Sequence, residues 1–173
     1  YDKVARQLKL DYPGGPKVDK LAKLGEDKYR FPRAMIDSDD YNFSFSGMKS
    51  AVINFVHNAN QRGEAIVPED LACSFQTAVV EVLITKTKKA IKNLGIKQLI
   101  LAGGVAGNSE LRQQILNLEK ELNIEVLIPQ MAYCSDNAAM MGAVGYFYYK
   151  NKLFTDPLTL NAKSTLDLEE IYK

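Results

Sequence analysis

One stretch, Leu99–Ser109, constrains the fold of this chain more than any other. Its apolar run Leu99–Ala102 predicts a buried strand, and Gly103 and Gly104 allow the backbone to turn sharply after it. Asn108 is a favourable N-cap for the helix that the following residues predict. Free backbone N–H groups point outward at such a helix N-terminus, so the stretch is either an anion or nucleotide site or an ordinary tight connection.

The segments around this stretch predict a parallel α/β arrangement. A strand over Lys97–Ala102, a helix over Asn108–Leu122 and a strand over Glu125–Pro129 follow one another. A strand, a crossover helix and a second strand imply a parallel pair with a right-handed connection. A polar cluster, Gln130–Asn137, comes next, followed by a helix rich in small residues over Ala138–Tyr149.

The first part of the chain predicts helices separated by a proline- and glycine-rich turn. The sequence begins without Met, in a segment that already has helical spacing and ends near Leu10, so we expect a piece of a longer protein. The turn Tyr12–Pro16 leads into a second helix, with Leu24 on its apolar face and Asp19 in its first turn. Turn chemistry alone is sufficient to explain the glycines of this segment.

The middle of the chain predicts strand-like segments and two helices. A short strand near Tyr29–Phe31 precedes residues 42–47, which alternate apolar and polar side chains with the period of a strand. Helical spacing begins at Met48, and the longest helix begins at Pro68 and ends at Gly95. Its C-terminal half carries a lysine cluster that either contacts RNA phosphates or, as we favour, suits the helix dipole. The cluster consists of Lys86, Lys88, Lys89 and Lys92.

Composition limits the class of protein. The 173 residues are 46% hydrophobic and 25% charged, which is enough for a packed core, and the net charge of +1 creates no global field toward nucleic acid or membrane. Cys73 and Cys134 lie far apart and predict a reducing compartment without a disulfide framework. No apolar run approaches the length that spans a bilayer, so we expect a cytoplasmic protein without a membrane partner.

Two residues are considered as metal ligands. His57 is the only histidine, and its position at a polar helix end predicts a surface residue. Asp136 stands at the start of the last helix, where it is either a helix cap, the simpler interpretation, or an oxygen ligand of a metal.

Five motifs occur together in the order and spacing of one known family. They are Tyr1–Ala5 (Tyr-Asp-Lys-Val-Ala), Tyr12–Pro16 (Tyr-Pro-Gly-Gly-Pro), Phe43–Lys49 (Phe-Ser-Phe-Ser-Gly-Met-Lys), Leu101–Asn108 (Leu-Ala-Gly-Gly-Val-Ala-Gly-Asn) and Cys134–Met140 (Cys-Ser-Asp-Asn-Ala-Ala-Met). With these motifs, nearly the whole chain resembles the C-terminal half of the TsaD (Kae/Gcp) family of tRNA threonylcarbamoyladenosine synthesis proteins, once labelled a glycoprotease family. The bacterial branch is the more similar one.

The resemblance implies an α/β fold, namely the C-terminal lobe of an actin-like ATPase (the ASKHA fold of actins, sugar kinases and heat-shock chaperones) with additional helices. Residues 1–67 would form a helical and β insertion region next to the nucleotide cleft. Residues 68–173 would form the actin-like α/β C-terminal lobe, with the N-terminal lobe absent. The implied activity of the full-length protein is that of an acyltransferase, N6-L-threonylcarbamoyladenine synthase. It transfers the threonylcarbamoyl group from threonylcarbamoyl-AMP to N6 of adenosine 37 in tRNAs that read ANN codons.

The resemblance also assigns site residues, motif by motif. Its substrate- or nucleotide-binding positions are Asp2, Gly15, Asp19, Gly103, Gly104 and Asn108. The glycine turns would admit the adenylate against the backbone, and the Asp2 carboxylate would accept hydrogen bonds from ribose hydroxyls. Asp136 matches the family's aspartate for one divalent metal ion, iron or zinc. No residue is assigned as catalytic.

One departure from the family pattern bears on activity. The family's H-x-x-x-H metal pair and its Ser-Gly-Gly-His loop belong to the N-terminal half, and neither occurs in this sequence. A single aspartate is a poor transition-metal site, so we expect this chain alone to bind metal weakly and to lack transferase activity. The expected partners are tRNA and TsaB- and TsaE-type proteins, and apolar surface left uncovered would favour self-association.

Two alternative functions stay open. One is a related actin-like carbamoyltransferase or ATPase domain, as in hydrogenase maturation, and the other is a non-catalytic scaffold of the same fold. The joint presence of Asp2, Gly15, Asn108 and Asp136 argues against the scaffold, which has no chemical need for them. A peptidase is disfavoured because no Ser/His/Asp or zinc-protease constellation is present.

Overall fold

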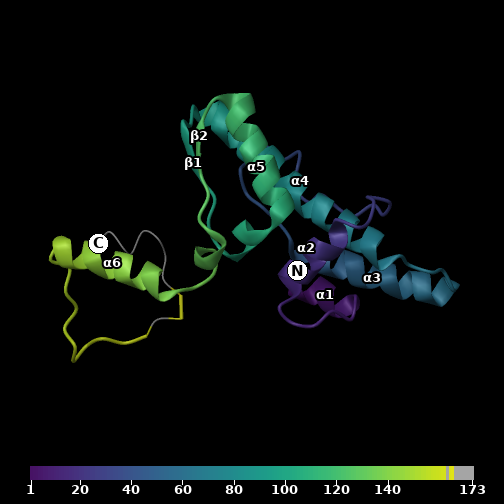
Figure 1. Ribbon diagram of the computed structural model, residues 1–173, viewed down its shortest axis with the longest axis horizontal. Helices are drawn as coiled ribbons and strands as arrows, with labels where there is room; N and C mark the ends of the chain where they lie inside the picture. Colours follow the sequence, from purple (N-terminus) through teal and green to yellow (C-terminus); the bar gives the residue numbers. More distant parts are fainter. Residues whose placement is uncertain (163, 166–173) are drawn as a thin grey trace. The chain divides into compact units, whose positions relative to one another are not determined.

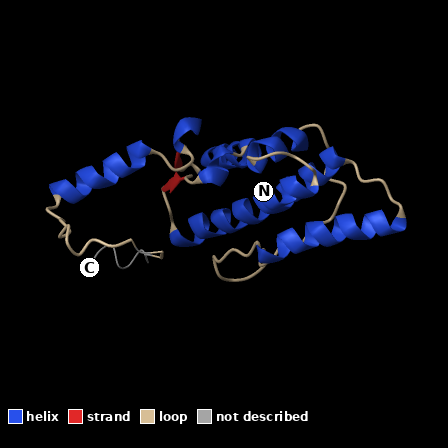
Figure 2. Cartoon of the chain, turned by 90° about the horizontal axis from the view of Figure 1, so that it is seen from below, coloured by secondary structure: helices blue, strands red, loops and turns tan. Residues whose placement is uncertain are grey.

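The computed structural model describes residues 1–162, 164 and 165. Its contacts divide the chain into two compact units, Tyr1–Ser135 and Asp136–Lys173. The first unit is mostly helical and contains a small parallel sheet (Figures 1 and 2). The predicted division into residues 1–67 and 68–173 follows the expected lobe boundary of the family and stays a prediction.

The first two helices are present where the sequence predicts them, but both are short. Helix α1 (Asp2–Gln7) ends before Leu10, because Lys9 adopts a left-handed φ of 54° and the Leu10 N–H bonds back to the Ala5 carbonyl. Helix α2 (Gly14–Ala22) begins after a cis Tyr12–Pro13 bond and two residues before Pro16, so Asp19 lies in its second turn and the prediction of a first-turn position is wrong. It ends too early to bury Leu24, which is 76% exposed, so the prediction of an apolar-face position for Leu24 is wrong.

The structure contains both of the longer helices that the sequence predicts. Helix α3 (Ser46–Arg62) begins two residues before the predicted Met48 and ends at Gly63. Helix α4 (Pro68–Leu94) is the longest, starts with Pro68 in its first turn, and ends at Gly95, whose φ of 65° is the left-handed value that favours glycine. The prediction of this helix is therefore confirmed at both ends.

The two strand-like segments before α3 are loops, so both strand predictions are wrong. Their aromatic side chains find partners among helices and each other instead of in a sheet. Tyr29 and Phe31 pack against Phe55 of α3 at ring distances of 4.8 and 5.7 Å. Phe43 and Phe45 stack on each other at 6.3 Å. Alternation alone does not make a strand where tertiary packing offers these contacts and no strand lies alongside in the described residues.

The core of the first unit runs along α4. The N-terminal half of the helix supplies Leu71 and Phe75 to a cluster with Val18 of α2 and Val52 of α3. The C-terminal half supplies Val80 to a second cluster with α5 and the strands. Helix α2 therefore packs on the N-terminal half of α4, and α5 packs on its C-terminal half (Figure 1). This arrangement positions the site.

The sheet confirms the predicted parallel pair. Strands β1 (Gln98–Ile100) and β2 (Glu125–Leu127) are parallel, with Leu99 opposite Val126, and α5 (Ser109–Leu122) connects them. Leu99 and Val126 face α5, whereas Ile100 is 64% exposed on the other face. Short 3₁₀ turns follow each strand, η1 (Gly104–Gly107) and η2 (Met131–Tyr133).

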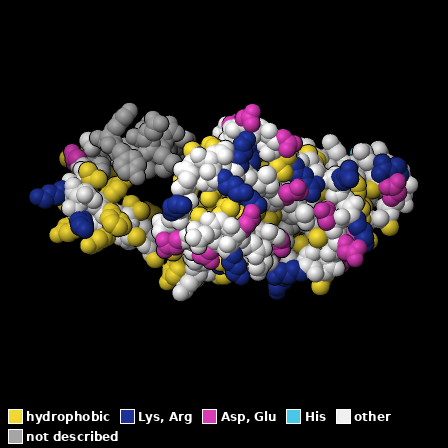
Figure 3. All heavy atoms as spheres, turned by 90° about the horizontal axis from the view of Figure 1, so that it is seen from above, with side chains coloured by type: hydrophobic (Ala, Val, Ile, Leu, Met, Phe, Trp, Pro, Cys, Tyr) yellow, Lys and Arg dark blue, Asp and Glu magenta, His cyan; other side chains and the backbone are white. Residues whose placement is uncertain are grey.

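The second unit contains helix α6 (Ala138–Lys150), as predicted. Its N-cap is Asn137, whose side chain accepts from the Met140 N–H, so the prediction that Asp136 caps this helix is wrong. Large apolar side chains are exposed along α6, and Figure 3 shows them gathered there. No described helix is long and apolar enough to cross a membrane. The polar sequence of residues 154–173 predicts an extended tail, and this segment lies partly outside the described residues.

Candidate nucleotide site

The N-terminus of α2 is fixed by a contact with α1. Asp2 Oδ1 accepts a hydrogen bond from the Gly14 N–H at 2.8 Å and so binds one of the free N–H groups at the helix start. A Cβ at Gly14 would lie 2.5 Å from Ala5 Cβ, so only glycine allows the two helices to approach this closely. Asp2 Oδ2 has no hydrogen-bond partner among the described residues and remains available as an acceptor.

Gly15, the next residue, differs from Gly14 in its surroundings. A Cβ there would meet no atom within 4 Å, so packing within the chain does not require glycine at this position. The absence of a side chain instead leaves open space over the backbone at the start of α2. A ligand can therefore approach the backbone closely at Gly15.

Asp19 lies one turn after Gly15 and joins α2 to the start of α5. Its Oδ1 accepts from Asn108 Nδ2 at 3.1 Å, from the Ser109 N–H at 3.2 Å and from Ser109 Oγ at 2.8 Å. Residues four apart lie on one helix face, so this contact holds the Gly15 face of α2 beside the N-terminus of α5. The two sites that the sequence analysis names at Asp19 and Asn108 are thus in direct contact.

Asn108 is buried, and both ends of its side chain are occupied. Oδ1 accepts from the Leu111 N–H at 2.9 Å, which confirms its predicted role as N-cap. Nδ2 also donates to Gln76 Oε1 of α4 at 2.7 Å. This residue therefore connects α2, α4 and α5 through one amide group.

Tyr1 adds a buried phenol to the same region. Its hydroxyl is buried without a hydrogen-bond partner in the described chain, and its ring packs edge-on against Phe75 at 5.0 Å. Burial, and secondarily the charge of Asp19, raises the pKa of Tyr1 well above its usual range. The phenol is therefore neutral at physiological pH and keeps its proton as a donor.

The glycine turn after β1 also leaves its backbone uncovered. Gly103 has a φ of 89°, which other residues rarely adopt, and a Cβ at Gly103 or Gly104 would meet nothing within 4 Å. The turn leads through η1 into Asn108, so it is joined directly to the hydrogen-bond network of Asp19. The predicted positions thus lie in two regions of the first unit that the Asp19–Asn108 hydrogen bond connects. Asp2, Gly15 and Asp19 belong to α1 and α2, and Gly103, Gly104 and Asn108 belong to the turn before α5.

Arg112 is a residue of this region that the sequence analysis missed. Its Nε donates to the Ala106 carbonyl at 2.6 Å, and its Nη2 donates to the Pro129 carbonyl at 2.6 Å and to Cys134 Sγ at 3.1 Å. It therefore ties the glycine turn to the segment that follows β2. Its spacing of four residues from the cap Asn108, on the same helix face, is the only sequence signal that could have found it.

The predicted metal ligand lies in the other unit. Asp136 is exposed at the start of the second unit, and His57 is exposed on α3. No group of three His, Cys, Asp or Glu side chains within residues 1–162, 164 and 165 could hold a metal ion. The described residues therefore do not fit a complete transition-metal site, and Asp136 stays a prediction as a single ligand.

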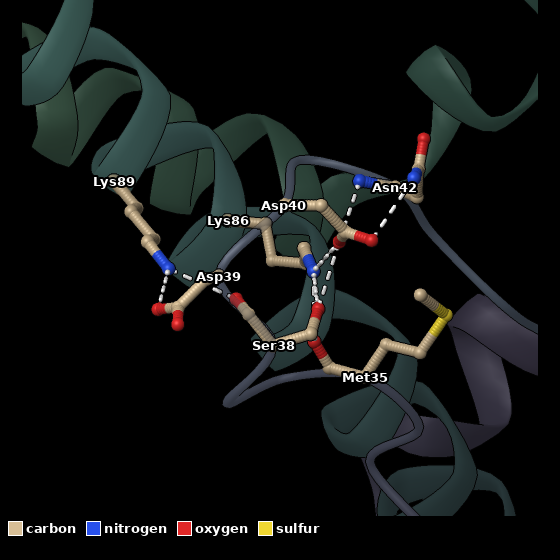
Figure 4. Close-up of polar contacts among 7 residues, drawn as sticks. All are labelled: Met35, Ser38, Asp39, Asp40, Asn42, Lys86 and Lys89. Atoms are coloured by element: carbon tan, nitrogen blue, oxygen red, sulfur yellow. Dashed lines mark hydrogen bonds and ion pairs between the residues drawn. The ribbon is translucent and has the colours of Figure 1, made fainter.

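The lysine cluster of α4 is occupied by contacts within the chain. Lys86 is buried and donates to the Met35 carbonyl, to Ser38 Oγ and to Asp40 Oδ1, and Lys89 donates to the Ser38 carbonyl and Asp39 (Figure 4). Hydrogen bonds from Ser38, Lys86 and Asn42 hold the pKa of Asp40 well below its usual range. Three of the four lysines are ion-paired, the third being Lys88 with Glu121. These ion pairs and hydrogen bonds therefore hold the loop at residues 35–42 and helix α5 against α4.

Taken together, these features define a class of protein. A parallel strand, an open glycine turn and a capped helix, joined to a second helix that begins with glycine, form an α/β unit suited to binding an anionic ligand such as a nucleotide.

Comparison with known proteins identifies the family within this class. Residues 1–143 match the family described as TsaD, tRNA N6-adenosine threonylcarbamoyltransferase. The chain is 52% identical over 170 residues to the tRNA N6-adenosine threonylcarbamoyltransferase of Staphylococcus carnosus, covering 98% of the chain and 49% of that relative. It is 50% identical to the enzyme of the same name from Staphylococcus haemolyticus over the same shares. The chain belongs to the TsaD family, and it spans about half the length of the curated relatives it matches.

Proposed function

We propose that this chain forms one wall of the nucleotide site of a tRNA threonylcarbamoyltransferase and is the C-terminal lobe of its actin-like ATPase fold. Family membership supports this proposal, and so does the parallel strand–helix–strand unit. The observation that carries it is the Asp19–Asn108 contact, which joins the two open glycine turns. The full-length protein would transfer the threonylcarbamoyl group from threonylcarbamoyl-AMP to N6 of adenosine 37 in tRNA.

The residues of this wall bind and orient the adenylate. Gly15 and the turn at Gly103 and Gly104 offer uncovered backbone to its adenosine and phosphate groups. Asp2 is oriented by the Gly14 N–H through Oδ1, which leaves Oδ2 to accept a hydrogen bond from a ribose hydroxyl. The hydrogen bond between Asp19 and Asn108 fixes the position of one turn relative to the other.

The metal of the family would draw on Asp136 as a single ligand from this chain. The described residues do not complete the coordination of this metal. We therefore propose that this chain alone has no transferase activity, and that tRNA and TsaB- and TsaE-type proteins are partners of the full-length protein.

A chimera tests this proposal. The segment of the Staphylococcus carnosus relative that matches this chain is replaced by the chain itself, and tRNA modification is measured with threonylcarbamoyl-AMP. We expect the chimera to modify tRNA, with the unchanged relative as positive control, and the chain alone to give no product. A chimera that binds the adenylate but leaves tRNA unmodified would refute the transferase assignment and favour the related ATPase or the scaffold. Turnover by the chain alone would contradict its proposed dependence on the rest of the protein.

A further inference from the structure

Positive charge is concentrated in the first two helices and the loop between them. Residues 1–23 carry six Lys and Arg against three Asp, a net charge of +3, whereas the rest of the chain carries −2. Two of these aspartates accept hydrogen bonds within the chain, Asp2 from the Gly14 N–H and Asp19 from Asn108 and Ser109.

Most of these cations have no acidic partner. Lys3, Arg6, Lys9 and Lys20 are exposed, and none forms an ion pair with a described carboxylate. The lysines of the C-terminal half of α4 are different, because three of the four are ion-paired within the chain. Cations without a local partner are the ones available to neutralise phosphate.

These cations lie on the outer side of packed helices. Lys3 and Arg6 are three residues apart on α1, on the side away from the buried Val4 and Ala5. Helix α1 packs against α2, where Lys20 is exposed. The unpaired cations therefore lie on two helices in contact, Lys3 and Arg6 on α1 and Lys20 in the last turn of α2, with Lys9 in the loop between them.

The loop itself presents an aromatic side chain. Tyr12 is 85% exposed, beside the open backbone of Gly15. Its neighbour Asp11 is paired with Lys17, and the unpaired Lys9 lies three residues before Tyr12. Proteins hold single-stranded nucleic acid with exposed aromatic rings that stack on unpaired bases and with cations that contact phosphates.

We propose that this surface, which consists of Lys3, Arg6, Lys9, Tyr12 and Lys20, binds a single-stranded loop of the substrate RNA. The cations contact its phosphates, and Tyr12 stacks on an unpaired base. This inference rests on the proposed function, because it places the RNA next to the proposed adenylate wall at Gly15. It adds the residues that contact the acceptor, which the nucleotide site does not define.

The test compares two triple variants of the full chain with equal loss of charge. One is Lys3→Gln/Arg6→Gln/Lys20→Gln, and its control is Lys92→Gln/Lys97→Gln/Lys120→Gln, three exposed cations without ion pairs elsewhere in the first unit. Binding of an unmodified tRNA transcript is measured by fluorescence anisotropy as a function of KCl concentration. ATP binding and the circular dichroism spectrum are measured in parallel for each variant.

We expect the first triple variant to weaken tRNA binding at least about tenfold and to reduce the slope of log K against log salt by about 2, since each phosphate contact contributes roughly 0.7–0.9. Tyr12→Ala weakens binding by about fivefold or more with the slope unchanged, and Tyr12→Phe binds as the parent does. The control triple variant keeps the parent slope.

Equal losses of tRNA affinity in both triple variants would refute the proposed RNA-binding surface, because binding would then depend on total charge. Undiminished tRNA binding in the first triple variant, with ATP bound, would also refute it while leaving the proposed function intact. Failure of the parent chain to bind either tRNA or ATP would instead count against the proposed function itself.

Discussion

The buried Lys86 gives the sharpest prediction about how this fold is stabilised. Its side chain is fully buried on α4, and its ammonium group lies 2.8 Å from the Met35 carbonyl and 3.1 Å from Asp40 Oδ1, with Ser38 Oγ as a third acceptor. Lys86→Met keeps an unbranched apolar stem of four atoms and removes the terminal ammonium group, the charged donor.

The cost of this substitution follows from what the acceptors can do without Lys86. A hydrogen bond to a charged group contributes about 1.5–3 kcal/mol, and breaking a fully buried ion pair costs about 3–5 kcal/mol. Asp40 retains 43% side-chain exposure and can be hydrated, and Ser38 Oγ also contacts both Asp40 and the Met35 carbonyl. We therefore expect a loss at the lower end, about 2 kcal/mol.

The assay is urea unfolding followed by circular dichroism, together with amide hydrogen exchange over residues 35–45. A loss of about 2 kcal/mol corresponds to about thirtyfold faster exchange where the loop opens locally. The matched control is Lys89→Met, one turn along α4, whose partner Asp39 is fully exposed. Its expected cost is below about 1 kcal/mol. Equal stability of the Lys86→Met variant and the parent, or equal losses in the two variants, would refute the reasoning.

Three further predictions concern packing, capping and pH. Gly14→Ala should destabilise the chain by about 1–3 kcal/mol in urea unfolding, because its Cβ would lie 2.5 Å from Ala5 Cβ. Asn108→Ala should cost about 2–4 kcal/mol by the same measurement, since α5 loses its cap and Gln76 loses a buried partner. The Glu26 N–H and, secondarily, Lys28 hold the pKa of Asp70 below its usual range. The stability that Asp70 provides is therefore complete above about pH 5, and it is lost as pH falls through the folded-state pKa of Asp70. Stability measured from pH 7 to pH 3 should therefore fall less steeply in Asp70→Asn than in the parent.

Each of these has a result that would contradict it. Parent stability in Gly14→Ala would mean that α1 and α2 separate at little cost. If Asn108→Ala lowers stability no more than a substitution at the surface does, the hydrogen bonds of Asn108 make no net contribution to stability. If stability falls equally steeply from pH 7 to pH 3 in Asp70→Asn and in the parent, Asp70 does not contribute to the pH dependence of stability.

Local chemistry was sufficient to predict several elements. Pro68 and Gly95 bound the longest helix because proline suits a first helical turn and glycine suits a left-handed C-cap. Asn108 caps α5 for reasons contained in its own side chain. The parallel pair followed from the order strand, helix, strand, although both strands are shorter than predicted. The prediction of a buried strand at Leu99–Ala102 is wrong, because only one face of β1 packs on α5 and Ile100 is 64% exposed.

Features that depend on distant residues were not predictable in this way. The Asp19–Asn108 contact joins residues 89 apart, and no local pattern encodes it. Lys86 continues the apolar face of α4, three and four residues after Leu83 and Val82, but no local pattern encodes the loop that accepts hydrogen bonds from its ammonium group. Residues 42–47 have the alternation of a strand, yet their aromatic side chains pack on each other and their end begins α3. The role of Gly15 is also a tertiary question, because only its surroundings distinguish it from Gly14.

The most direct test of the proposed nucleotide site compares Gly15→Ala with Gly47→Ala in ATP binding by calorimetry. Both glycines are the second residue of a helix, and a Cβ would meet no atom within 4 Å at either one, so neither substitution should lower stability. If the open backbone at Gly15 receives the ligand, Gly15→Ala weakens ATP binding at least about tenfold, which is about 1.4 kcal/mol, while Gly47→Ala binds as the parent does. Unchanged ATP affinity in a folded Gly15→Ala variant would contradict the account.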